Sequence, residues 1–256
     1  GEPAVVPTVL EIDPAWRDGF LFAYPQRPQN YLVADVETTG FSIYNDFVVH
    51  LAMLEVVGGR PVGCTSVYLD WTTPKTGPPM FTEDSLRRKL QYISEQAAKR
   101  GKKLHFDFER YRREKIDAYV VLRMLYGVLD AAVRNNYAMA GHNFLRFDAN
   151  MLTNHYEQIF KIGSPFNFLT LIDTGGLEKA RQIRLFPEPG EPMSKFSRRA
   201  VTAAGKGIKW DLHDHCVEVY GLREKTAALV EHDPADDCMK SHYVLETLAD
   251  AIGWRP

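Results

Sequence analysis

Two carboxylates stand close together at the end of an apolar run in NYLVADVETTG, residues 30–40. Side chains of a strand alternate between its two faces, so Asp35 and Glu37 point to the same side. Their like charges repel each other unless a cation neutralises them. Hard divalent cations such as Mg²⁺ and Mn²⁺ prefer oxygen ligands, which carboxylates on a strand supply. The pair therefore indicates a metal site, and a site for two ions needs further carboxylates.

A second candidate is AMAGHNFLRFDANML, residues 138–152. A short buried strand ends at Gly-His-Asn, and Asp148 opens the next helix. Taken alone, Asp148 is an ordinary residue of a helix N-terminus. Its position after the end of a buried strand makes it a candidate third ligand.

A third candidate is VEHDPADDCMKSH, residues 230–242, where Asp233 and the proline after it are typical of the start of a helix. Asp236 and Asp237 fall in the first turn of that helix, where the helix dipole already accounts for acidic residues. His232 lies five positions before Asp237, which brings an imidazole and a carboxylate to the same place across the helix cap. An imidazole titrates near neutral pH and suits a general base.

Together, the three segments resemble the three motifs of the DEDDh 3′–5′ exonucleases, the DnaQ-like group on an RNase H-like fold. DVETTG resembles the first motif, GHNFLRFD the second, and His-x4-Asp the third, a register that selects Asp237 over Asp236. One residue more than in the commonest form separates Asn143 from Asp148, a spacing that some DNA-degrading members share. The resemblance covers about residues 31–70 and 117–252.

The resemblance implies an α/β fold, an RNase H-like mixed sheet with three antiparallel strands and then parallel strands, flanked by helices. It implies two Mg²⁺ ions, for which Mn²⁺ substitutes, held by Asp35, Glu37, Asp148 and Asp237. His232 is then the general base that deprotonates the attacking water. The 3′-terminal nucleotide is expected to contact the segment after the first motif and Asn143, that is Thr38, Thr39, Gly40, Phe41 and Asn143. We therefore expect a metal-dependent 3′–5′ exonuclease that releases nucleoside monophosphates from nucleic acid with a free 3′ end, single-stranded DNA being favoured and RNA possible.

The remaining pattern predicts where these residues are positioned. We expect an irregular N-terminal arm at 1–30 and an exonuclease domain at 31–256 that carries a basic helical insertion at about 84–116. Strands are predicted at 31–37, 47–57, 62–69, 137–140 and 167–172, the first three as an antiparallel meander. Helices are predicted at 83–100, 105–116, 117–135, 148–160, 176–185, 212–220 and 234–252, with a loop region at 186–209.

Composition is that of an ordinary globular protein. The chain has 256 residues, of which 45% are hydrophobic and 25% charged, and its net charge of −2 indicates no general attraction to nucleic acid or membrane. Its three cysteines are widely spaced and contain no CxxC pair, which argues against a disulfide framework or a zinc site. We expect no signal peptide, no membrane contact, and an intracellular, reducing, cytoplasmic location.

A basic block from Leu86 to Lys115 contains 11 Lys and Arg residues against 4 Asp and Glu residues, so the rest of the chain is acidic. Such a helix is usually a solvated face. Five aromatic side chains interleave with the charges, and they suit either stacking on single-stranded bases or anchoring of the insertion to the core: Tyr92, His105, Phe106, Phe108 and Tyr111.

Two other functions compete with the exonuclease. Residues 35–39 resemble the nucleophile motif of HAD-type phosphohydrolases, with Asp35 as nucleophile, but that interpretation gives His232 no role. The other alternative is a non-catalytic nucleic-acid-binding protein on the same fold, although all five expected catalytic positions are filled.

Overall fold

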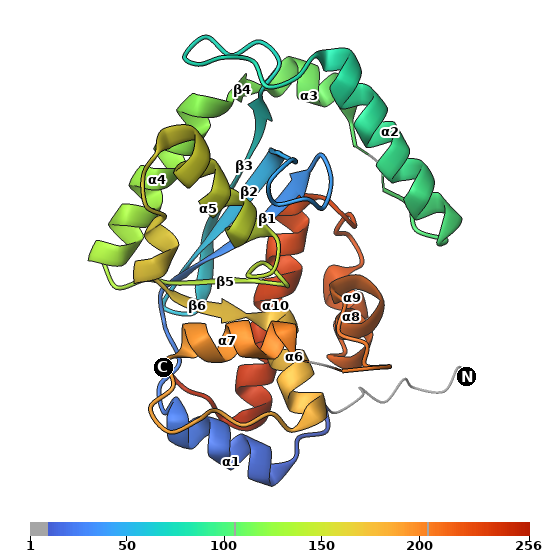
Figure 1. The fold of residues 1–256 in the computed structure, drawn as a ribbon. Helices are drawn as coiled ribbons and strands as arrows, with labels where there is room; N and C mark the ends of the chain where they lie inside the picture. The colour runs from blue at the N-terminus through green and yellow to red at the C-terminus, as the bar shows by residue number, and fades with distance from the viewer. Residues whose placement is uncertain (1–9, 105, 204) are drawn as a thin grey trace.

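The computed structural model describes residues 10–104, 106–203 and 205–256. Within them, six strands form one sheet in the order β4–β3–β2–β1–β5–β6 (Figure 1): β1 (Tyr31–Thr38), β2 (Val48–Val57), β3 (Arg60–Asp70), β4 (Ile116–Asp117), β5 (Ala138–Gly141) and β6 (Thr170–Asp173). Strands β1, β2 and β3 pair antiparallel, whereas β1 with β5, β5 with β6, and β3 with β4 pair parallel. The α/β fold with antiparallel and then parallel strands is confirmed, and β4 is a short strand that the sequence pattern did not predict.

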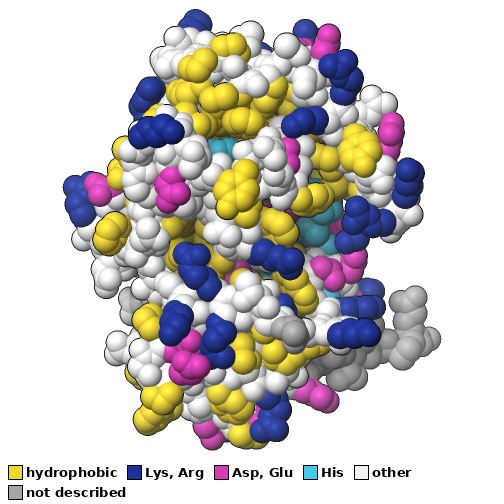
Figure 2. All heavy atoms as spheres, in the orientation of Figure 1, with side chains coloured by type: hydrophobic (Ala, Val, Ile, Leu, Met, Phe, Trp, Pro, Cys, Tyr) yellow, Lys and Arg dark blue, Asp and Glu magenta, His cyan; other side chains and the backbone are white. Residues whose placement is uncertain are grey.

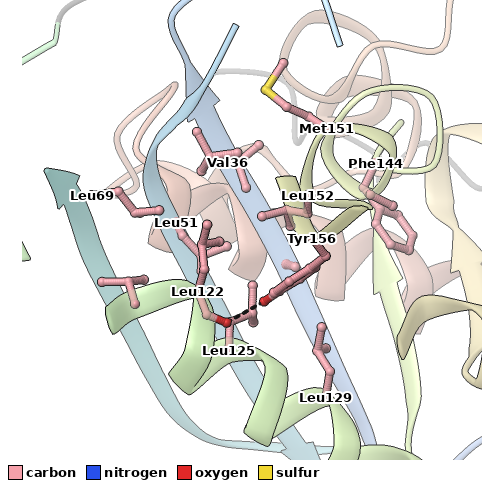
Figure 3. Close-up of a cluster of buried hydrophobic side chains, with 14 of the residues drawn as sticks. Val36, Leu51, Leu69, Leu122, Leu125, Leu129, Phe144, Met151, Leu152 and Tyr156 are labelled. Atoms are coloured by element: carbon pink, nitrogen blue, oxygen red, sulfur yellow. Dashed lines mark hydrogen bonds between the residues drawn. The ribbon is translucent and has the colours of Figure 1, made fainter. Parts of the chain in front are cut away.

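One face of the sheet is covered by α4 (Ala118–Arg134), α5 (Asp148–His155) and the π-helix η1 (Tyr156–Phe160). Figure 3 shows the packing of Leu122, Leu125 and Leu129 of α4 against the sheet. The Tyr156 hydroxyl donates a hydrogen bond to the Leu122 carbonyl at 2.6 Å, which satisfies the polar atom of a buried aromatic ring.

The opposite face is covered by α1 (Pro14–Ala23), α6 (Thr174–Ile183), α7 (Met193–Thr202) and α10 (Pro234–Ile252). Residues of β1 alternate between the two cores: Leu32, Ala34 and Val36 face α4, whereas Tyr31 and Val33 face α10. By the same alternation, the side chains at positions 35 and 37 lie on the α10 side of the sheet.

Two predicted irregular regions contain helices. The described part of the N-terminal arm forms α1, with Asp13 as N-cap, Pro14 at the first position, and Trp16 and Phe20 fully buried; residues 1–9 lie outside the described part. The predicted loop at 186–209 contains α7, which begins directly after a proline, and its residues at helical spacing are buried: Met193, Phe196, Ser197, Ala200 and Val201. In both cases a proline stands at the helix start, a position where proline is favoured.

Two predicted helices are irregular instead. The helix expected at 148–160 continues from α5 into η1, and the one expected at 212–220 begins as the π-helix η3 (Leu212–Cys216) before α8 (Val217–Val219) and α9 (Arg223–Thr226). A 3₁₀ turn, η2 (Pro165–Phe168), takes the place of the start of the strand predicted at 167–172. None of the helices in the described ranges is both long and apolar enough to cross a bilayer.

The basic insertion forms α2 (Glu83–Lys99) and α3 (Phe108–Glu114), which extend along one side of the molecule (Figure 1). Leu86 and Tyr111 are fully buried, and Phe106 and Phe108 pack against the same core. Phe106, Phe108 and Tyr111 therefore anchor the insertion to the core. Of the other two aromatic residues, His105 lies outside the described residues, and Tyr92 projects from α2 with 62% of its surface exposed.

Candidate active site

The first acidic pair lies at the end of β1. The register of β1 against β2 shifts between Glu37 and Thr38, so the strand ends at this point. Asp35 and Glu37 are partly buried on the side of the sheet that α10 covers. Burial raises the pKa of both carboxyls well above the usual range, and the negative charges of Asp237 and Asp148 add to the increase.

The loop after β1 is fixed by Asp46. Its carboxylate accepts hydrogen bonds from the Thr39 hydroxyl at 2.9 Å and from the Ser42 backbone N–H at 2.8 Å. A Cβ atom at Gly40 would lie 2.4 Å from this carboxylate, so any other residue there would displace Asp46 from these hydrogen bonds. Phe41, next in the loop, keeps 71% of its surface exposed and lies edge-on to Phe147, with ring centroids 6.1 Å apart.

The second segment is organised by Asp173 at the end of β6. This fully buried carboxylate accepts hydrogen bonds from the backbone N–H groups of Asn143, Leu145 and Gly176 at 2.8, 3.1 and 3.0 Å. Burial raises its pKa to about 6, although these hydrogen bonds oppose the shift. Asn143 has a φ of 56°, a left-handed conformation that asparagine tolerates better than most residues. The parallel strands β5 and β6 therefore bring this loop to the edge where β1 ends.

Asp148 lies at the first position of α5, with its carboxyl against β1. Burial and the negative charges of Asp173 and Asp237 raise its pKa well above the usual range, and hydrogen bonds from the backbone N–H groups of Val36 and of Asp148 itself partly offset this. Its Oδ2 atom is buried and has no hydrogen-bond partner. The structure therefore brings this carboxylate beside the pair on β1, although the sequence places it more than 100 positions away.

The third segment separates the roles of its two adjacent aspartates. Asp236 accepts a hydrogen bond from the Val230 backbone N–H at 2.8 Å and closes the turn before α10. Asp237 is 5% exposed and faces the other carboxylates. His232 has a φ of 60°, a strained conformation for a histidine, of the kind found where a structure holds a side chain in a required position. Burial and the neighbouring His213 lower its pKa.

These segments converge on one cluster. Carboxylate oxygens of Asp35, Glu37 and Asp237 lie within 4.8 Å of one another. The Oδ2 atom of Asp35 and the Oδ1 atom of Asp237 are buried without a hydrogen-bond partner, like Oδ2 of Asp148. Among the described residues, no lysine or arginine forms an ion pair with any of the four acids. Oxygen ligands with unmatched negative charge are the donor set that Mg²⁺ and Mn²⁺ prefer, so the residues present fit such ions.

Two residues that the sequence analysis missed border the cluster. His213, on the π-helix η3, has its ring centroid 4.8 Å from that of His232, and its Nε2 atom lies 3.5 Å from Oδ1 of Asp237. The buried Lys240 places its Nζ atom 3.1 Å from Nδ1 of His213. Because an ammonium group only donates, Nδ1 accepts and the ring proton lies on Nε2, directed at Asp237. Lys240 lies three positions after Asp237 in α10, a spacing that was visible in the sequence, whereas nothing in the sequence marked His213.

The expected nucleotide-binding residues are at the rim of the cluster. The Thr38 hydroxyl donates to the Gly40 carbonyl at 2.6 Å, and the hydroxyl of buried Thr39 is engaged by Asp46, so neither is directed outward in this conformation. Gly40 and Phe41 line a groove together with Thr39 and His232. Oδ1 of Asn143 is buried without a hydrogen-bond partner.

Comparison with solved structures identifies the fold. The chain is similar to E. coli Exonuclease I in complex with a dA16 oligonucleotide, at 12% identity and a TM-score of 0.52, over 87% of this chain and 41% of that chain. It is also similar to E. coli Exonuclease I with a 5cy-dA13 oligonucleotide, at 13% identity and a TM-score of 0.53, over 88% and 42% of the two chains. A product-bound exonuclease I gives 13% identity and a TM-score of 0.52, over 89% and 46%.

The chain thus spans less than half the length of the exonuclease I chains that it matches. No protein-family model and no curated protein sequence matches it. The resemblance to the DEDDh exonucleases is confirmed at the level of the fold, which is that of exonuclease I.

Proposed function

We propose that this chain is a metal-dependent 3′–5′ exonuclease that releases nucleoside monophosphates from the 3′ end of nucleic acid, with DNA as the preferred substrate. One observation carries the proposal: carboxylate oxygens of Asp35, Glu37 and Asp237 lie within 4.8 Å of one another, with the buried carboxyl of Asp148 near them and the His232 imidazole beside Asp237. Solved structures with the same fold contain single-stranded DNA oligonucleotides, which supports the choice of substrate.

In this proposal, Asp35, Glu37, Asp148 and Asp237 hold two ions of the Mg²⁺ class. When bound, these ions supply a Lewis acid for the scissile phosphate and lower the pKa of the attacking water. Desolvation and the charges of neighbouring acids raise the pKa of Asp35, Glu37 and Asp148, and the positive charge of the ions would offset this increase.

His232 takes the proton of the attacking water. Its lowered pKa favours the neutral imidazole, which is the form that a general base requires. The Nε2 atom of His213 faces Oδ1 of Asp237 at 3.5 Å without a hydrogen bond, so the dipole of the ring favours one orientation of that carboxylate, with Lys240 fixing the tautomer of the ring. His213 is a positioning residue in this scheme, because it acts through Asp237.

The terminal nucleotide is held at the rim. The exposed Phe41 ring offers a face for the terminal base. Asn143 has an unpaired amide oxygen near the second segment and is free to accept a hydrogen bond from a bound water or nucleotide.

A ladder assay tests the proposal. Single-stranded DNA labelled at its 5′ end should shorten stepwise from the 3′ end in Mg²⁺ or Mn²⁺ and remain intact in EDTA. Asp237→Asn should abolish shortening, whereas the matched variant Asp236→Asn should keep most of it, because Asp236 only closes the turn before α10.

Three results would contradict the proposal. Cutting of a circular strand would show an endonuclease, and binding in Mn²⁺ without degradation would show a non-catalytic protein. Trapping of an aspartyl-phosphate on Asp35, with activity retained in His232→Ala, would favour the phosphohydrolase.

A further inference from the structure

A groove of about 770 Å³ extends from the rim of the carboxylate cluster along the basic insertion. Thr39, Gly40 and Phe41 line one side of it, and His232 lies at its inner end. The other side is formed by α2 and the residues after it, which contribute Arg88, Lys89, Tyr92, Ile93, Gln96, Ala97, Arg100, Lys102 and Leu104. In Figure 2, Lys, Arg and hydrophobic side chains border a hollow on the right of the molecule, and a histidine is visible within it.

Three of the four positive charges on the groove wall form no ion pair within the described part of the protein. Among the described residues, Arg88, Arg100 and Lys102 take part in no ion pair, and Lys89 pairs only with Asp46 across the groove, at 3.4 Å. Other basic residues of the insertion behave differently: Arg112 pairs with Glu83 at 3.0 Å. A row of cations without ion-pair partners therefore faces the groove, although Lys99, Lys103 and Arg113, which do not line it, also form no ion pair among the described residues.

Aromatic rings accompany these cations. Tyr92 lies on the α2 side with 62% of its surface exposed, and Phe41 lies on the opposite side with 71% exposed. Neither ring is needed to hold the insertion in place, because Tyr111, Phe106 and Phe108 bury against the core. Exposed rings between cations are the combination on which bases of a single strand stack while its phosphates meet positive charge.

The wall is attached to both sides of the cluster. Lys89 of α2 pairs with Asp46, which fixes the loop after β1. Arg110 of α3 has its Nη1 atom 3.9 Å from Oδ2 of Asp233, the N-cap of α10, next to His232. These contacts fix the position of the groove relative to the carboxylate cluster. A nucleic-acid strand that leaves the cluster therefore has a defined path along α2.

We propose that this groove binds single-stranded nucleic acid on the 5′ side of the nucleotide being removed, with Arg88, Arg100 and Lys102 meeting phosphates and Tyr92 stacking on a base. The inference rests on the proposed function for its direction, since the 3′ end lies at the carboxylate cluster. A duplex hides its base faces in the stack, so the exposed rings select a single strand.

The test measures affinity without cleavage, in the full-length chain carrying Asp35→Asn and in EDTA. The probe is a labelled oligothymidylate of about 12 nucleotides. Arg100→Ala with Lys102→Ala should weaken binding about tenfold and reduce the slope of log affinity against log salt by about 1.4, because two phosphate contacts are lost. Lys99→Ala with Lys103→Ala is the matched control, since it removes the same charge from exposed neighbours that do not line the groove.

Equal weakening in the two double variants would overturn the proposal, because a general electrostatic attraction would then explain the binding. Tyr92→Ala should weaken binding about tenfold and Tyr92→Phe should restore it. An unchanged affinity in Tyr92→Ala would overturn the stacking contact. If a blunt duplex bound as tightly as the single strand and lost affinity to the same extent in the groove variants, that result would overturn the choice of a single strand.

An oligouridylate of the same length tests whether the groove binds single-stranded RNA as well as single-stranded DNA. A loss with both probes supports a groove that uses phosphates and base faces, a loss with DNA alone supports a DNA groove, and a loss with neither overturns the proposal. Cleavage by the unmodified chain is measured separately. Groove-dependent binding without cleavage would reject the proposed function alone, and cleavage without groove-dependent binding would reject this inference alone.

Discussion

Two buried acidic centres of this protein are neutralised in opposite ways. On α6, the fully buried Glu178 carboxylate pairs with Arg181 at 2.7 Å and with Nε2 of His215 at 2.9 Å, and it accepts a hydrogen bond from the Tyr220 hydroxyl. Burial alone would raise the pKa of Glu178, but the hydrogen bonds from Arg181 and Tyr220 bring it below its usual value.

At the end of β1, burial raises the pKa of Asp35 and Glu37, and the neighbouring charges are acidic and raise it further. The chain therefore supplies a guanidinium to a buried acid whose role is structural. The cluster on β1 has no such partner among the described residues, which points to a cation taken from solution. Five experiments break or sharpen this comparison.

The largest effect is expected from Asp35→Asn. Loss of a ligand should reduce the rate of 3′ shortening about 10³-fold or more, because the transition-state charge loses its stabilisation. In EDTA the same variant should unfold at a higher urea concentration than the unmodified chain, because one repelling charge is gone. Single-turnover cleavage and urea unfolding measure the two effects, and a less stable variant in EDTA would refute the idea that the cluster is strained without metal.

Glu178→Gln should act in the opposite direction. It leaves Arg181 largely buried without its charge partner, so the free energy of unfolding should fall by about 3–5 kcal/mol. Urea unfolding measures the loss. Asp130→Asn, which breaks the exposed pair with Arg134 on α4, is the control and should cost less than about 0.5 kcal/mol. Similar costs in both variants would show that Glu178 is not held as the structure indicates.

Mg²⁺ should stabilise one centre and not the other. At an ion concentration of about 100 times the dissociation constant, the free energy of unfolding should rise by about 2.7 kcal/mol. Thermal unfolding with Mg²⁺, compared with thermal unfolding after removal of metal with EDTA, measures the increase. It should persist in Glu178→Gln and disappear in Asp35→Asn, and an increase of the same size in Asp35→Asn would place the ion elsewhere.

Two neighbouring histidines of η3 divide between the centres. His213→Gln should raise the Mg²⁺ concentration needed for half-maximal cleavage about tenfold, because Asp237 loses the group that orients it. His215→Gln should reduce stability and leave the Mg²⁺ requirement unchanged, since His215 contacts Glu178. A metal titration of cleavage, with urea unfolding in parallel, separates the two; an unchanged requirement in His213→Gln would remove its assigned role.

The smallest effect concerns pH. Because the pKa of Glu178 is lowered in the folded protein, its ionised form contributes stability above the unfolded-state pKa of about 4.3, and this is lost as pH falls through that value and below. The difference in unfolding free energy between the unmodified chain and Glu178→Gln should therefore be constant from pH 8 to about pH 6 and shrink below about pH 4.5. Urea unfolding across this range measures it, and a difference that grows in acid would reverse the assigned sign.

Local signals in the sequence were sufficient to predict the strand and the helix that carry Asp35, Glu37 and Asp237. The alternation of β1 and the Asp233–Pro234 helix start predicted the faces and bounds that the structure shows. The meeting of the three segments depends on the sheet order, which came from the family resemblance and not from any one residue. The catalytic roles assigned to Asp35, Glu37, Asp148, Asp237 and His232 remain predictions.

What the sequence did not predict involves contacts between distant residues. Asp173 lay just beyond the strand predicted at 167–172 and was assigned no role, yet three backbone groups of two other segments depend on it. His213 gave no signal, because it reaches the cluster only through the irregular geometry of η3. For α7, burial of Phe196 and Ala200 against the sheet outweighed the proline and glycine residues before it.

The wider turn of η3 has a consequence for how this site is altered by small insertions and deletions. Successive residues of a regular helix are rotated by about 100°, and a π-turn holds one residue more than a regular turn. Deleting a single residue within 212–216 would regularise the turn and rotate the imidazole at position 213 away from Asp237. Homologues that differ by one residue in this short segment should therefore differ in whether a histidine reaches the metal-binding carboxylate, even when every acidic ligand is retained.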